Sequence, residues 1–100
     1  MVVTIFRSRV RADADQEALS RLGEKMFEYA TAMPGFISYK DFTAEDGESV
    51  SIIEFDSEET LAAWRDHGEH KDAQARGRSE FFSEYHIQVC KPIRESRRKR

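Results

Sequence analysis

Two histidines and the only tryptophan of the chain fall within one short run, LAAWRDHGEHKDAQ, from Leu61 to Gln74. Histidine takes up and releases a proton near neutral pH, because its ordinary pKa is about 6.5. Tryptophan offers a flat apolar surface with one N–H donor. The run therefore predicts one of three things: a proton-transferring reaction centre, a metal or haem site, or an exposed helix face beside a buried indole.

The spacing of these histidines argues against a zinc site. His67 and His70 are three residues apart, so on a helix their side chains can share a ligand. Zinc-binding helices place histidines four residues apart, as in H-E-x-x-H, and need a third ligand. The run HGEH has neither this motif nor a cysteine or aspartate cluster to complete it. We expect no metal here.

A catalytic role for these histidines would be that of a general base. Dioxygen is a triplet and reacts with closed-shell organic molecules only after an electron-rich anion forms. Removing a phenolic or enolic proton forms such an anion, which a nearby cation or N–H donor then stabilises. We predict His67 or His70 as the base. The structural alternative for each is an exposed or hydrogen-bonded histidine at a helix end.

Other residues of the run are candidates for binding a substrate. If one helix continues through it, three polar residues project near Trp64, and His70 lies on the adjacent line of the helix. These three are His67, Lys71 and Gln74. Trp64 itself is either a core residue or a pocket wall that stacks on an aromatic ligand.

Two further candidates lie outside the run. Tyr39 falls on a predicted strand, and Arg78 follows Gly77, where it could supply a cation at a pocket mouth. The third histidine, His86, is expected to face solvent or a partner subunit. The predicted substrate-binding set is Trp64, Tyr39, Lys71, Gln74 and Arg78.

Four strands are predicted from β-branched, aromatic and alternating residues. The first covers 2–11, and the segments 36–44 and 49–55 form a β-hairpin around the turn EDGE. A last strand follows a short helical turn and ends at Pro92, with Tyr85, Ile87 and Val89 on one face. In the first hairpin strand we expect Phe36, Ser38, Lys40 and Phe42 on the face opposite Ile37, Tyr39 and Asp41.

Two segments have the spacing of amphipathic helices. The first, 15–33, has Asp13 or Asp15 to cap its start and ends at Pro34–Gly35. The second opens at Asp56, whose spacing from Glu59 is that of a capping box. It runs to about residue 74 or 76, with a break at Gly68 left open.

The resulting order, β-α-β-β-α-β, is the ferredoxin-like arrangement of an α+β fold, a four-stranded antiparallel sheet with both helices on one face. The first and third strands carry apolar residues on both faces, although the helices cover only one. A second copy of the same sheet is the simplest way to cover the face that the helices leave open. We therefore expect a homodimer whose sheets pack face to face.

Length, composition and charge limit the class of protein. One hundred residues with 39% apolar and 35% charged residues describe one soluble globular domain. No apolar run approaches the roughly 20 residues of a membrane span, and the alternating first ten residues are not those expected of a signal peptide. The lone Cys90 fits a reducing compartment, so we expect a cytoplasmic protein.

The last seven residues differ in net charge from the rest of the chain. The segment 94–100, RESRRKR, carries five basic residues and one acidic residue, a net charge of +4. Because the net charge of the whole chain is −3, the net charge of residues 1–93 is −7. We expect a folded domain over 1–93 and a disordered basic tail over 94–100. An acidic domain is unsuited to nucleic acid, and no glycine motif for a nucleotide is present.

Several segments together resemble the antibiotic biosynthesis monooxygenase (ABM) family. They are the turn Pro34–Gly35–Phe36, the hairpin turn Asp46–Gly47–Glu48, Trp64 within LAAWRDHGEH, the segment AQARGR and the aromatic pair before the last strand. The resemblance covers residues 1 to about 93. It implies a dimeric α+β barrel with a pocket between sheet and helices in each subunit.

The family that the chain resembles has several activities. Some members are cofactor-free oxygenases of aromatic polyketides or quinols. Others degrade haem with an asparagine on the first strand, a tryptophan on the second helix and a histidine ten residues later. Trp64 matches this pattern, but Gln74 stands at the histidine position and the chain contains no asparagine. The asparagine that polyketide oxygenases hold beside their tryptophan is therefore missing as well.

The resemblance implies a monooxygenase that uses no cofactor. Its substrates would be dioxygen and a small phenolic, quinol or polyketide-like aromatic molecule. The alternative is a non-catalytic homodimer that binds a small apolar or aromatic ligand, with haem as one candidate.

Overall fold

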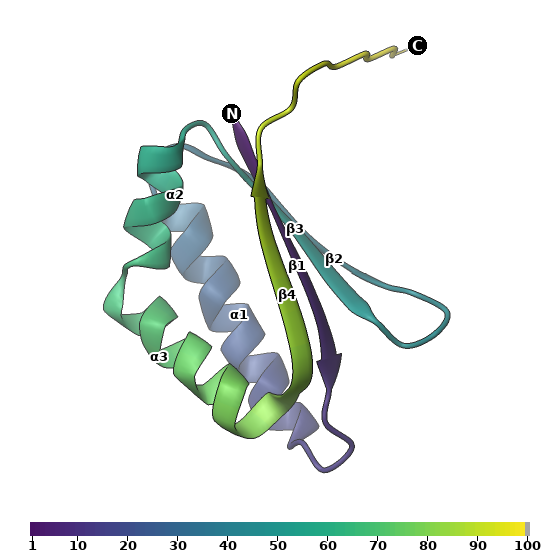
Figure 1. The fold of residues 1–100 in the computed structure, drawn as a ribbon. Helices are drawn as coiled ribbons and strands as arrows, with labels where there is room; N and C mark the ends of the chain where they lie inside the picture. The colour runs from purple at the N-terminus through teal and green to yellow at the C-terminus, as the bar shows by residue number, and fades with distance from the viewer. Residues whose placement is uncertain (100) are drawn as a thin grey trace.

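Four strands form one antiparallel sheet, and the helices lie on one of its faces (Figure 1). The computed structural model describes residues 1–99, and of Glu69 only the backbone. The strand order β2-β3-β1-β4 is that of a ferredoxin-like α+β fold, which confirms the predicted fold class. The elements are β1 (Val2–Val10), α1 (Gln16–Ala32), β2 (Phe36–Thr43), β3 (Ser49–Phe55), α2 (Glu58–Arg65), α3 (Gly68–Arg76), a π-helical turn (Gly77–Phe81) and β4 (Phe82–Cys90).

The register of the strands sorts their side chains onto two faces. Thr4 of β1 pairs with Ile53 of β3 and with Val89 of β4, so these three side chains point the same way, toward the helices. Ile5 and Ile52 pair on the opposite face. The predicted division of the first strand into two apolar faces is confirmed.

The predicted face of one side chain in β2 is wrong. The register shifts between Phe36 and Ser38, so that Phe36 pairs with Phe55 and packs edge-on against it, with 5.9 Å between ring centroids. The physical reason is the extra residue between the two, which reverses the alternation at that point. Phe36 therefore lies on the helix-facing side together with Tyr39, whereas Ser38 stays on the other face.

The first helix begins and ends near the predicted residues. Asp15 is its N-cap, and its side chain accepts a hydrogen bond from the amide of Ala18 at 3.0 Å. Met26 and Ala30 of this helix are buried in the core, as expected of an amphipathic helix. The helix is followed by Met33 and the turn at Gly35, where φ is +83°.

The second predicted helix is two helices, α2 and α3, separated at residues 66–67. The predicted capping box of Asp56 and Glu59 is off by one residue. Ser57 is the last residue with extended backbone and is therefore the N-cap, and its hydroxyl accepts from the amide of Thr60 at 3.2 Å. The hydroxyl of Thr60 in turn accepts from the amide of Ser57 at 3.3 Å, which completes the box.

Beyond β4 the described chain forms no helix or strand. Lys91 contacts Glu58 near the start of α2, with 3.4 Å between Nζ and Oε1. The division between domain and tail at residue 93 stays a prediction, and Arg100 lies outside the described residues. None of the helices within residues 1–99 is long and apolar enough to cross a membrane.

Candidate functional site

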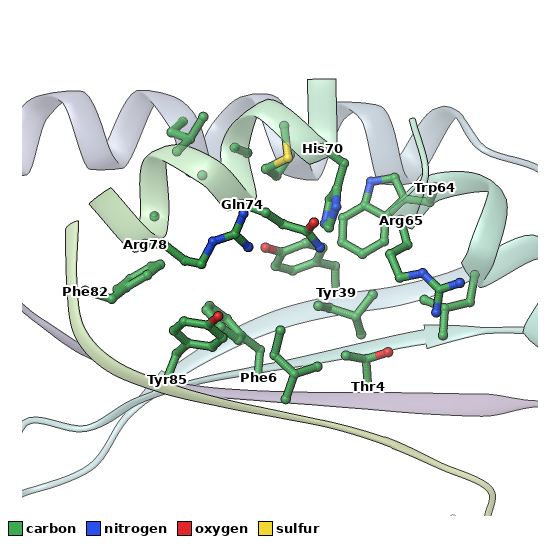
Figure 2. Close-up of a pocket in the computed structure, with 18 of the residues that line it drawn as sticks. Thr4, Phe6, Tyr39, Trp64, Arg65, His70, Gln74, Arg78, Phe82 and Tyr85 are labelled. Carbon is green, nitrogen blue, oxygen red and sulfur yellow. The ribbon is translucent and has the colours of Figure 1, made fainter. Parts of the chain in front are cut away.

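A cavity of about 280 Å³ lies between the helices and the helix-facing side of the sheet (Figure 2). Its inner wall is apolar and includes buried residues such as Met26 and Ile53. The wall along β4 is open, because Tyr85, Ile87 and Val89 line the cavity and are each 45–48% exposed. The cavity is thus closed at the helix side and accessible along one edge of the sheet.

Trp64 forms the deep wall of the cavity. It is 3% exposed, stacks on Phe55 with 5.7 Å between centroids, and meets Tyr39 edge-on at 6.1 Å. The cap at Ser57 and the buried Leu61 fix the helix that carries the indole. Trp64 is therefore a core residue and a pocket wall at once, and these are the two positions that the sequence left as alternatives.

His70 packs directly on the indole of Trp64. Their ring centroids are 4.2 Å apart and the planes are tilted by 57°. Burial is the main cause that lowers the pKa of His70 from its ordinary value, and it outweighs the opposing effect of a hydrogen bond with the backbone of Arg65. His70 is therefore neutral at pH 7.

Three buried polar atoms, each from a residue that lines the cavity, have no hydrogen-bond partner among the described residues. They are Thr4 Oγ1, Trp64 Nε1 and His70 Nδ1. Leaving such an atom unpaired costs about 1–3 kcal/mol. The Arg65 backbone engages the other ring nitrogen of His70, so Nδ1 keeps its lone pair. A ligand hydroxyl group that reaches His70 could donate a hydrogen bond to Nδ1.

Tyr39 forms the wall of the cavity on the β2 side. Burial raises the pKa of Tyr39 to about 12, the charge of Asp41 adds to this, and a hydrogen bond with Ser51 opposes it. The phenol therefore stays protonated at neutral pH and can act as a hydrogen-bond donor.

Alkaline titration should show one phenol that ionises late. Measured by the ultraviolet absorbance of phenolate, we expect Tyr39 to ionise near pH 12 in the folded protein and about 10 after denaturation. Because the folded pKa is the higher one, the contribution to the free energy of unfolding is complete below pH 10 and is lost as pH rises toward 12. Tyr39→Phe should remove the late step and Tyr85→Phe should keep it. A late step that persists in Tyr39→Phe contradicts the assignment.

The break between α2 and α3 decides which predicted residues reach the cavity. A single helix would place His67 and Lys71 beside Trp64, but neither is among the described lining residues. The ring of His67 instead stacks on Tyr29 of α1, with 5.2 Å between centroids, and His70 takes the place beside the indole. The roles of all seven predicted site residues stay predictions. Those that line the cavity are Tyr39, Trp64, His70, Gln74 and Arg78.

Sequence reasoning missed the contribution of β1 and β4 to the cavity. Thr4 and Phe6 line it from β1, and Phe82 and Tyr85 line it from β4. The rings of Phe6 and Phe82 meet edge-on at 5.5 Å. Alternation along both strands was the available signal, but how far the helices extend over the sheet could not be read from it.

Metal binding has no support from side-chain grouping. Within the part of the chain that the structure describes, no three histidine, cysteine, aspartate or glutamate side chains lie close enough to hold an ion. His86 pairs with Arg7 on the face of the sheet away from the helices, where solvent or a partner was expected.

The fold and the site define a class: a small α+β domain with an apolar, ligand-sized cavity between a ferredoxin-like sheet and its helices. Within that class the chain belongs to the antibiotic biosynthesis monooxygenase (ABM) family, whose model matches residues 1–76. This confirms the resemblance stated from the sequence.

Individual relatives agree with this assignment. The chain is 30% identical over 91 residues to the uncharacterized protein YqjZ of Bacillus subtilis. The matched segment covers 91% of this chain and 79% of YqjZ. The structure of Rv0793 from Mycobacterium tuberculosis is similar with a TM-score of 0.82 at 26% identity, over 96% of this chain and 98% of that one. SnoaB, a cofactor-independent oxygenase from Streptomyces nogalater, shares the fold with a TM-score of 0.77 at 10% identity, over 94% of each chain.

Proposed function

We propose that the protein is a cofactor-independent monooxygenase that acts on a small phenolic, quinol or polyketide-like aromatic molecule, with His70 as the general base. The observation that carries the proposal is the unpartnered Nδ1 of a neutral His70 in the wall of an apolar cavity, against Trp64. Family membership and the shared fold with an oxygenase support the same class of reaction.

The first step is removal of the phenolic proton by His70 Nδ1. The phenolate that forms lies in an apolar cavity, where donors stabilise charge more strongly than in water. The side-chain amide of Gln74, which lines the cavity, can donate a hydrogen bond to this phenolate. His67, the other candidate base, is less suited because its ring stacks on Tyr29 and is not part of the described lining.

The second step is reaction of the anion with dioxygen. One electron passes from the phenolate to dioxygen, and the radical pair combines to form a C–O bond. The peroxide takes the proton held by His70. Loss of the C–H proton and cleavage of the O–O bond then give a ketone or quinone and water. A phenol and dioxygen yield a quinone and water, so atoms and electrons balance without an external reductant.

The test is oxygen uptake by the purified protein with a panel of phenols and quinols under ¹⁸O₂. We expect one labelled oxygen atom in the product, the other in water, and no release of hydrogen peroxide. Simple two-electron oxidation of a quinol would release peroxide and leave the product unlabelled. That outcome, or no turnover of any compound, would overturn the proposal.

Titration with haem addresses the alternative, a homodimer that binds a ligand without turning it over. A saturable shift of the Soret band at one haem per subunit, together with no phenol turnover, would favour that alternative. No shift together with labelled product supports the oxygenase.

We also propose that the protein is a homodimer in the cytoplasm. The support for the dimer is the uncovered face of the sheet, where Val3, Ile5 and Ile52 are only half-buried by their own chain and Phe42 is 52% exposed. Sedimentation equilibrium should give twice the chain mass, and a monomer at micromolar concentration would contradict the assembly.

A further inference from the structure

The charged side chains of the cavity wall are both arginines. Arg65 and Arg78 line the cavity, and no aspartate or glutamate among the described residues does. Arg65 contacts Asp66, with 3.4 Å between Nε and Oδ1. The cavity as described is therefore apolar with a positive rim.

Arg78 differs from the other arginines of the domain. Each of the other six in residues 1–93 forms an ion pair with an aspartate or glutamate, whereas Arg78 forms none with any described residue. Arg76, two residues before it, contacts Glu80 at 2.9 Å and lies over the ring of Phe81 at 5.3 Å. Of the two arginines that line the cavity, Arg65 is paired with Asp66 and Arg78 is the one without an ion pair to any described residue.

The π-helical turn directs Arg78 to this position. Gly77 starts the turn against the ring of Phe82, so closely that a Cβ atom there would lie 2.9 Å from Phe82 Cε2. Arg78 follows directly, and Figure 2 shows its guanidinium pointing into the cavity toward the side where Gln74 and Tyr39 lie. Such turns within helices are frequently found at functional sites.

We propose that the ligand of this cavity is an aromatic hydroxy acid whose carboxylate is bound by Arg78. The planar guanidinium matches a carboxylate with two parallel hydrogen bonds, and no described acidic residue competes for it. The aromatic ring lies between Arg78 and the Trp64–His70 pair, with its hydroxyl group toward His70. This orientation rests on the proposed function, whereas the carboxylate contact concerns binding alone.

The test compares two ligands that differ only in charge. Calorimetric titration of the full chain with 6-hydroxy-2-naphthoate and with 6-hydroxy-2-naphthamide, at low salt and without dioxygen, measures the preference for the carboxylate. We expect the acid to bind about 10–100-fold more tightly than the amide, as a charge-assisted hydrogen-bonded pair does. Equal affinity of the two compounds would overturn the proposal.

Variants assign the preference to one side chain. Arg78→Gln should bind acid and amide equally, and Arg78→Lys should keep part of the preference because it keeps the charge. Arg76→Gln is the matched control on the same segment and should keep all of it. A preference that survives Arg78→Gln would contradict the assignment.

The binding experiment separates this inference from the proposed reaction. If Arg78 selects the carboxylate but no aromatic acid is oxygenated, only the reaction fails. If neutral phenols are oxygenated and the acid shows no advantage in binding, only the inference fails.

Discussion

Replacing His70 by glutamine is expected to lower kcat/KM for oxygenation of the phenolic substrate by about 10²–10⁴-fold, the usual contribution of a general base. Glutamine keeps a polar side chain of similar reach but cannot take up a proton. Initial rates of oxygen uptake measure the effect. Thermal unfolding of the variant shows whether the loss is chemical or structural, because a folded variant that has lost turnover identifies His70 as the base.

The other two histidines provide matched controls. His67 stacks on Tyr29, and His86 lies on the far face of the sheet, so His67→Gln and His86→Gln should keep turnover within a factor of about three, which corresponds to less than about 1 kcal/mol. If His70→Gln retains the wild-type rate, or if His67→Gln loses it, the proposed base is wrong.

The pH dependence of turnover follows from the lowered pKa of His70. The neutral imidazole is the active form, so kcat/KM should stay high as pH falls through the ordinary histidine value of about 6.5 and decline only below it. The free energy of unfolding should change with pH in the same direction. Because the unfolded chain takes up the proton first, the contribution of buried His70 is complete above about pH 6.5 and is lost as pH falls.

Replacing Gly35 by alanine should destabilise the domain by about 3 kcal/mol, the sum of a positive-φ penalty and overpacking. The backbone at Gly35 has φ +83°, and an added Cβ would meet Asp56 Oδ1 and lie 2.7 Å from Thr60 Cγ2. The carbonyl of Gly35 also accepts from the amide of Asp56 at 2.8 Å, so the turn cannot move away without losing this bond. Urea denaturation measures the change in unfolding free energy.

Gly47 offers a control for the backbone alone. Its φ is +90°, but nothing lies within 4 Å of a Cβ placed there. Gly47→Ala should therefore cost only the conformational penalty of about 1–2 kcal/mol. Equal losses in Gly35→Ala and Gly47→Ala would mean that the contact with the start of α2 contributes nothing.

Periodicity, together with turn and cap residues, was sufficient to predict the fold class. The three- and four-residue spacing that leads to Met26 and Ala30 identified α1, and the alternation around the Gly47 turn identified the hairpin. The facing of Phe36 could not be predicted, because it depends on a shift of register against β3. The cap of α2 lies one residue after the predicted Asp56, because Ser57 is the last residue with extended backbone and residue type alone does not reveal this.

The site was harder to predict than the fold. Trp64, His70 and Arg78 were predicted as site residues from residue type, but which of His67 and His70 lines the cavity depended on where the helix breaks. That break lies beside the stacking of His67 on Tyr29, a contact between segments far apart in the chain. The unpaired state of Arg78 is likewise a property of the folded molecule, since its neighbour Arg76 has a carboxylate partner four residues away.

Trp64 packs on His70 with 4.2 Å between ring centroids, so the fluorescence of Trp64 should depend on the protonation state of His70. An imidazolium ion quenches the fluorescence of an adjacent indole more strongly than a neutral imidazole does, and the chain has one tryptophan. The emission of the native protein therefore records the protonation of this one histidine, without a label or a substrate. Its midpoint, compared with the acid limb of the rate profile, reports whether the group that titrates is also the group that reacts.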